Sequence, residues 1–130
     1  MIATEAIRPG DYMPEHDGAC GAVATFQGVV RNRNGGRVVH CIEYECYREM
    51  AESEIARIVK AAAETYGLGE ARAVHRVGRV AAGETSIFVV AMAPHRSEAF
   101  AAVRAIVDDI KAHVPIWKKE HYDDATAQWL

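Results

Sequence analysis

The sequence predicts an α+β fold, in which helices pack on one face of an antiparallel sheet in two layers. Two segments carry apolar residues at three- and four-residue spacing, residues 49–66 and a later segment that ends before Pro115. This spacing predicts amphipathic helices. Stretches rich in Val, Ala, Thr, Ile and Phe precede each helix and predict strands. Turn signals between neighbouring strands favour antiparallel hairpins.

Length and composition set the class of protein. A chain of 130 residues, half of them hydrophobic and a quarter charged, is expected to form one domain over residues 1–130 with its own core. The formal net charge of -3 provides no basis for nonspecific nucleic-acid binding. The start of the chain does not read as a signal peptide, and no apolar stretch reaches the roughly 20 residues that cross a bilayer. We therefore expect a cytoplasmic protein without a membrane span.

The first third of the chain predicts strands separated by one strong turn. Residues 2–7 favour a short strand, and residues 8–18, with two prolines and two glycines, favour an irregular loop. Residues 20–31 and 37–47 predict two longer strands. Between them, Asn32-Arg-Asn-Gly-Gly36 contains residue types that tolerate positive φ, which predicts a turn. The two strands are expected to pair as a long antiparallel hairpin.

The first helix is predicted over residues 49–66 and ends at Gly67 and Gly69. Its expected apolar stripe comprises Met50, Ile55, Ile58, Val59, Ala62 and Tyr66.

Residues 71–80 and 84–93 predict two further strands, joined by Ala81-Ala-Gly83. Residues 86–92 are nearly all apolar, which favours a central strand buried on both faces. The second helix is expected to be capped by Ser97 and to end before Pro115, which cannot continue a helix. Its expected stripe comprises Phe100, Val103, Ile106, Val107 and Ile110.

The segment around Pro115 is the first candidate site. A turn at this proline can bring Lys118 back near Lys111, beside the aromatic ring of Trp117. Two ammonium groups held together suit an anionic ligand or proton transfer. An alternative is that Lys111 only complements the helix dipole and that Lys118, Lys119 and Glu120 form a solvated surface.

The second candidate site is the dipeptide His95–Arg96 at the start of the second helix. Free amide groups at a helix N-terminus favour anions, and a guanidinium matches a phosphate or carboxylate. The alternative is a capping histidine beside a solvated arginine. Arg31 lies at the first turn and is a third place where a cationic side chain stands at the end of a predicted element. His75–Arg76, inside a strand, is expected to have a core or interface role.

The three cysteines, Cys20, Cys41 and Cys46, form no CxxC pair and are expected to be free thiols. Other histidines have no metal-ligand spacing, and no P-loop or dinucleotide motif is present. The sequence therefore predicts neither a metal site nor a bound cofactor.

An ordered set of motifs over nearly the whole chain resembles the MoaE family, the large catalytic subunits of molybdopterin synthase. The motifs are Gly21-Ala22, Phe26-x-Gly28-x-Val30-Arg31-Asn32, Asn34-x-Gly36, Glu43-Tyr44-Glu45-x-Tyr47-x-x-Met50-Ala51, His75-Arg76-x-Gly78, Gly83-Glu84, His95-Arg96-x-x-Ala99-Phe100, Lys111 and Val114-Pro-Ile-Trp-Lys-Lys-Glu120. The tail departs from the family, because no glycine precedes Trp129.

The resemblance implies an α/β hammerhead fold and a sulfur-transfer reaction. The family forms the dithiolene of molybdopterin from cyclic pyranopterin monophosphate. Its sulfur donor is a small ubiquitin-like carrier subunit, MoaD-like, with a C-terminal Gly-Gly thiocarboxylate. Two large subunits form a homodimer at the centre of a heterotetramer.

The resemblance also implies roles for individual residues. Lys111 and Lys118 match the two lysines of the active site. Substrate and anion binding falls to Arg31, His95 and Arg96, with Val29 and Val30 beside Arg31, and with Lys119 and Glu120 adjoining the pocket.

Two other functions remain open on the residues alone. A non-catalytic dimeric module could bind an anionic metabolite or peptide tail without turnover, although it gives no reason for pairing Lys111 with Lys118. A small phosphatase could use Arg96 for phosphate, but it needs a nearby nucleophile or metal site, and none is evident.

Overall fold

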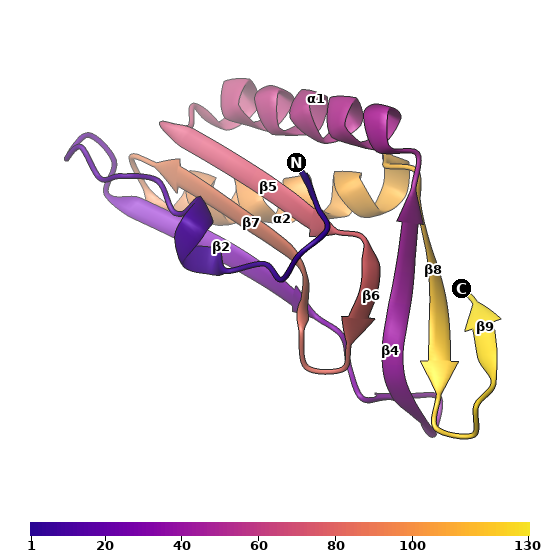
Figure 1. Cartoon of the computed structure of the whole chain (residues 1–130). Helices are drawn as coiled ribbons and strands as arrows, with labels where there is room; N and C mark the ends of the chain where they lie inside the picture. Colours follow the sequence, from indigo (N-terminus) through magenta and orange to yellow (C-terminus); the bar gives the residue numbers. More distant parts are fainter.

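The structure is a computed structural model that describes residues 1–130 (Figure 1). The chain has two α-helices and nine strands, and the strands form two sheets that meet side by side. The elements are β1 (Ile2–Ala3), the short 3-10 helix η1 (Pro9–Tyr12), β2 (Ala22–Val29), β3 (Arg33–Asn34), β4 (Arg37–Cys46), α1 (Arg48–Tyr66), β5 (Glu70–Arg76), β6 (Gly78–Ala81), β7 (Thr85–Ala93), α2 (Arg96–His113), β8 (Ile116–Tyr122) and β9 (Ala127–Trp129).

The first sheet has the strand order β1-β5-β7-β2, with β7 in the interior. Strand β7 pairs antiparallel with β2 and β5, whereas β1 pairs parallel with β5. Every residue from Ser86 to Ala93 is buried, which confirms the predicted central strand. Both helices cover one face of this sheet, and Ile7 and Tyr12 of the N-terminal segment pack on the other face. The predicted α+β class is confirmed.

Helix α1 confirms the prediction for residues 49–66 and ends in a left-handed glycine. Gly67 has φ 62°, and its N–H donates to the carbonyl of Ala63, which closes the last turn. Helix α2 ends at His113, before Pro115, as predicted. The predicted cap at Ser97 is wrong, because α2 begins at Arg96 and the extended residue His95 precedes it without a side-chain capping bond.

The prediction of a buried apolar stripe is wrong for one residue on each helix. Met50 is 58% exposed and Phe100 is 67% exposed. Alanines next to them face the sheet instead: Ala51 and Ala99 are at most 1% exposed. Small side chains let the helices approach the sheet closely, so the buried stripes follow the alanines rather than the larger neighbours.

The second sheet has the strand order β3-β4-β8-β9, and β6 also pairs with β4. The predicted hairpin of residues 20–31 with 37–47 is therefore wrong, since β2 pairs with β7 in the first sheet and β4 pairs with β8 and β6 in the second. The turn itself exists. Gly35 and Gly36 have φ of 57° and 79°, and they join the short strand β3 to β4. A turn motif reverses the chain without selecting the partner of a long strand.

The chain passes from the helix-covered sheet to the second sheet between β2 and β3 and again between β5 and β6. The predicted strand over residues 71–80 is divided at Val77, so that β5 lies in the first sheet and β6 in the second. Gly78, with φ 88°, allows the change of direction. The segment after Pro115 is strand β8 rather than a turn, and Figure 1 shows it between β4 and β9.

Replacing Ile55 by alanine is expected to lower the free energy of unfolding by about 2–5 kcal/mol, because truncation leaves a cavity in the core. The matched change, Met50→Ala on the same helix, is expected to alter it by less than about 0.5 kcal/mol, because Met50 is exposed. Urea unfolding followed by circular dichroism measures both values. Equal losses for the two variants would contradict the position of the buried stripe on α1.

Candidate active site

A cleft lies where the two sheets and the end of α2 meet. It consists of two adjoining hollows of about 250 and 210 Å³. We call them the Trp117 side, which includes His75 and Trp117, and the Arg31 side, which includes Arg31 and Arg33. The residues that line both are Tyr44, Ser86, Ile87, Lys111, Lys118 and Leu130. The two lysines therefore stand where the hollows join.

The structure brings Lys111 and Lys118 together from different elements. Lys111 lies in the last turn of α2, where the helix dipole favours a cation. Lys118 lies on β8, opposite Tyr44 of β4. Both lysines are solvent-exposed, so their ammonium groups are accessible to a ligand in the cleft.

The alternation along β8 separates neighbouring residues. Lys118 and Glu120 line the cleft, whereas Lys119, between them, lines neither hollow. Lys119 is opposite Trp129 of β9, and its ammonium nitrogen lies 5.5 Å from the centroid of that ring. Because successive strand residues point to opposite faces, Lys119 points away from the cleft.

The Arg31 side is predominantly cationic. Val29, Val30 and Arg31 line it as they leave the first sheet. Glu120 is the only acidic side chain that lines it; Glu120 is 4% exposed and accepts a hydrogen bond of 2.9 Å from the Asn34 side-chain amide. Four cationic side chains, Arg31, Arg33, Lys111 and Lys118, against one acidic side chain suit an anionic ligand.

His95 and Arg96 do not join this cleft within one chain. They lie at the start of α2, whereas Lys111 lies near its end. At about 1.5 Å per residue, the fifteen steps from Arg96 to Lys111 span about 22 Å. Neither residue lines either hollow.

His75 is a cleft residue that sequence reasoning placed in the core or at an interface. It is 8% exposed, and its ring lies edge-on to that of Tyr44, with 4.9 Å between centroids. Burial lowers the pKa of His75 to about 4, and the charges of Lys111 and Lys118 act in the same direction. One sequence feature could have indicated this position: His75 lies two residues after Ala73 on the same strand, so both side chains point to the face that the helices cover.

Tyr44 shares this environment. Burial raises the pKa of the Tyr44 phenol, and Glu120 acts in the same direction, whereas a hydrogen bond with Ser86 opposes the shift.

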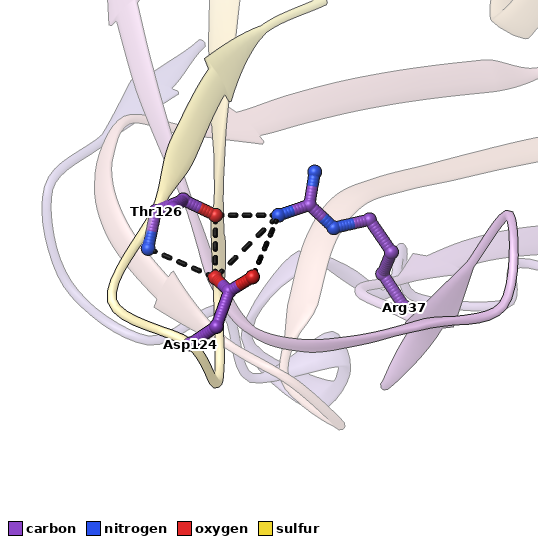
Figure 2. Close-up of polar contacts among 3 residues, drawn as sticks. All are labelled: Arg37, Asp124 and Thr126. Atoms are coloured by element: carbon purple, nitrogen blue, oxygen red, sulfur yellow. Dashed lines mark hydrogen bonds and ion pairs between the residues drawn. The ribbon is translucent and has the colours of Figure 1, made fainter.

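A polar cluster anchors the hairpin that carries β8 and β9 (Figure 2). The Arg37 guanidinium contacts the carboxylate of Asp124 at 3.2 Å and donates to the hydroxyl of Thr126. It also lies over the ring of Tyr122, 3.5 Å from the centroid. Hydrogen bonds from Thr126 and the nearby Arg37 charge lower the pKa of Asp124. The cluster ties the turn after β8 to the start of β4 and so supports the cleft wall.

The cysteines lie apart from the cleft. All three are free, and neither hollow includes one of them. No group of three or more His, Cys, Asp and Glu side chains is arranged to hold a metal ion. Neither α1 nor α2 combines the length and apolarity that crossing a bilayer requires.

An α+β chain with a cationic cleft between two sheets belongs to the class of proteins whose charge suits an anionic ligand. The family described as MoaE protein matches residues 2–113, and the chain belongs to this family.

Named relatives support this membership. The molybdopterin synthase catalytic subunit of Oryza sativa subsp. indica is 47% identical over 108 residues, which are 83% of this chain and 56% of the rice protein. The chain thus spans little more than half of that relative. The protein of the same name from Thermoplasma volcanium is 41% identical over 109 residues, covering 84% of this chain and 80% of that protein. A solved structure of molybdopterin synthase from Staphylococcus aureus superposes with a TM-score of 0.92 and 33% identity, covering 99% of this chain and 94% of that one.

The stability of the fold is expected to fall steeply between pH 6.5 and 4 because of His75. The unfolded chain protonates this imidazole near pH 6.5, whereas the folded chain does so near pH 4. The unfolded state therefore binds more protons in this window, which costs the fold about 3 kcal/mol as the pH falls through it. Urea unfolding at several pH values should show a shallower fall for His75→Phe.

The exposed histidine His16 provides the control, and His16→Phe should retain the steep fall. An unchanged pH dependence in His75→Phe would show that other groups cause the acid instability.

Proposed function

We propose that this chain is the catalytic subunit of a molybdopterin synthase that acts in the cytoplasm. In this proposal it transfers sulfur from the thiocarboxylated Gly-Gly tail of a small ubiquitin-like carrier to cyclic pyranopterin monophosphate and forms the dithiolene. One observation carries the proposal: Lys111 and Lys118, from two different elements, line both hollows of the cleft. Relatives named molybdopterin synthase catalytic subunit support the synthase part of the proposal.

The two sides of the cleft suit the two reactants. The Arg31 side offers guanidinium and ammonium groups to the substrate phosphate. Gly28, Val29 and Val30 form part of its wall. The Trp117 side is lined mainly by hydrophobic residues and is the expected entry for the narrow carrier tail. The thiocarboxylate then meets the substrate beside the two lysines.

The lysines are the proposed catalytic groups. As the carrier's sulfur attacks a substrate carbon, negative charge grows on oxygen, and an ammonium group in contact with it stabilises that charge. The same group can donate a proton to the departing oxygen, and water then cleaves the bond between the sulfur and the carrier's acyl carbon, which releases the carrier as a carboxylate and leaves the sulfur on the substrate. Glu120 lies near the lysines and holds the strand in place through Asn34, so its proposed role is to orient the binding wall.

A second copy of the chain is the proposed source of His95 and Arg96. The length of α2 separates them from the lysines of their own chain. In a two-fold dimer, the start of α2 from one protomer can complete the cleft of the other, which makes two equivalent sites. This arrangement is the homodimer core to which one carrier binds on each side. Lys119 contacts Trp129 and is proposed to hold β9 rather than the substrate.

Lys118→Ala is expected to reduce dithiolene formation on the order of a hundredfold or more, because one charge-stabilising group is lost from the reacting centre. The assay combines the purified chain with thiocarboxylated carrier and substrate and follows the product. Lys60→Ala, which removes an exposed lysine from α1, is the control for charge and should retain full activity.

Lys119→Ala tests the geometry of β8. It removes the same charge one residue away but from the opposite face, so its loss should be far smaller than that of Lys118→Ala. Near wild-type activity of Lys118→Ala would refute its catalytic role. Tight binding of both reactants by the wild type without product would favour the non-catalytic module.

Mixing two inactive variants tests the shared site. Lys118→Ala and Arg96→Ala proteins, each inactive alone, are expected to regain about a quarter of wild-type activity once their protomers exchange randomly, because half of the dimers then contain one intact site of two. The measurement is dithiolene formation after co-refolding. No recovery, with exchange verified by mass spectrometry, would show that Arg96 and Lys118 must lie in the same protomer and would contradict the shared site.

A further inference from the structure

His75 occupies the last helix-facing position of β5, where the core gives way to the cleft. Ala73, two residues earlier, packs in the core beneath the helices, and Val74 packs on the opposite face of the sheet. His75 therefore points toward the helix side, and its partner across the sheet, Ile87, lines the cleft beside it. A histidine here replaces the apolar side chain that a core position would take.

The one hydrogen bond of the His75 ring assigns its tautomer. Nδ1 lies 2.8 Å from the backbone carbonyl oxygen of Arg76. A carbonyl oxygen only accepts, so Nδ1 carries the proton, and Nε2 of the neutral ring is an acceptor. Nε2 makes no hydrogen bond within the chain, and it is not among the polar atoms sealed from solvent without a partner. It therefore opens onto the cleft.

Cationic groups surround this imidazole from several elements. Lys111 of α2, Lys118 of β8 and the N-terminal amine beside β1 all oppose its protonation, and Tyr44 of β4 covers its ring. Burial first, and these charges second, lower the pKa of His75 to about 4, so the imidazole is neutral at physiological pH. It is an uncharged acceptor within a cationic cleft.

An uncharged acceptor suits one component of the proposed reaction. The carrier tail, Gly-Gly with a thiocarboxylate, offers only an anionic end and peptide N–H groups. A carboxylate at position 75 would repel the thiocarboxylate and neutralise the lysines. A neutral imidazole accepts a peptide N–H without either effect, and an unpaired peptide N–H in a narrow cleft is costly.

We propose that His75 is a carrier-binding residue, whose Nε2 accepts a hydrogen bond from a peptide N–H of the Gly-Gly tail and so sets the depth at which the thiocarboxylate reaches Lys111 and Lys118. This role rests on the proposed function, because it needs the carrier as the occupant of the Trp117 side. It differs from the role of the lysines, which contact the reacting atoms.

The test pairs a change in the protein with a change in the carrier. Two carriers, each with one glycine amide of the tail replaced by an ester, lack one N–H but keep the shape of the tail. Calorimetry measures the binding of carriers whose tails end in a carboxylate. One of the two ester carriers should bind the wild type about tenfold more weakly than the unmodified carrier does. The same replacement should weaken binding to His75→Phe less than about twofold. An equal loss in both proteins overturns the proposal.

Kinetics supply the second readout. In His75→Phe, which keeps an aromatic ring beside Tyr44, KM for the thiocarboxylated carrier should rise about tenfold while KM for the pterin substrate stays within about twofold. His75→Gln, whose amide oxygen can reach the position of Nε2, should recover most of this loss. A rise in KM for the pterin substrate alone would overturn the assignment to the carrier.

The two hypotheses fail in different ways. If the wild type forms no dithiolene with carrier and substrate, the proposed function is wrong. If the wild type is active and His75→Phe matches it in carrier KM and in ester sensitivity, the proposed function stands and His75 serves only packing.

Discussion

The register between β4 and β8 is the constraint on which the candidate site depends. Lys118 lies opposite Tyr44, and Glu120 lies opposite Ile42, so both face the cleft. A shift of one residue would turn Lys119 inward and Lys118 outward, since successive side chains alternate between faces. The Asn34–Glu120 hydrogen bond and the Arg37 cluster hold this register from the side of β3 and from the far turn.

The cleft forms where the two sheets meet, and both sheets contribute residues to it. The first sheet contributes His75 and Ser86, the second contributes Tyr44 and Lys118, and α2 contributes Lys111. Like charges brought together repel, and the cleft limits this repulsion by keeping its buried imidazole neutral. The lysines stay exposed, so water screens their charges until a ligand enters.

Helix α2 connects two kinds of electrostatic site. Its C-terminal end, with Lys111, favours a cation, and its N-terminal end, with His95 and Arg96, favours an anion. Within a single chain the two ends of α2 lie too far apart to contact the same ligand. A symmetric pair of chains can, and this gives a physical reason for the homodimer that the proposed function requires.

The sequence by itself determined the features that depend on near neighbours: helix α1, the buried strand β7, the reversal at Gly35–Gly36 and the stop before Pro115. Propensity, hydrophobic period and proline geometry act over a few residues, so they can be read locally. Only the tertiary structure decided that β4 pairs with β8 rather than β2, that Lys118 and not Lys119 faces the cleft, and that His75 joins them. Which strands pair, and which of two neighbouring strand residues faces the cleft, depend on packing between distant segments, and no local sequence pattern contains this information.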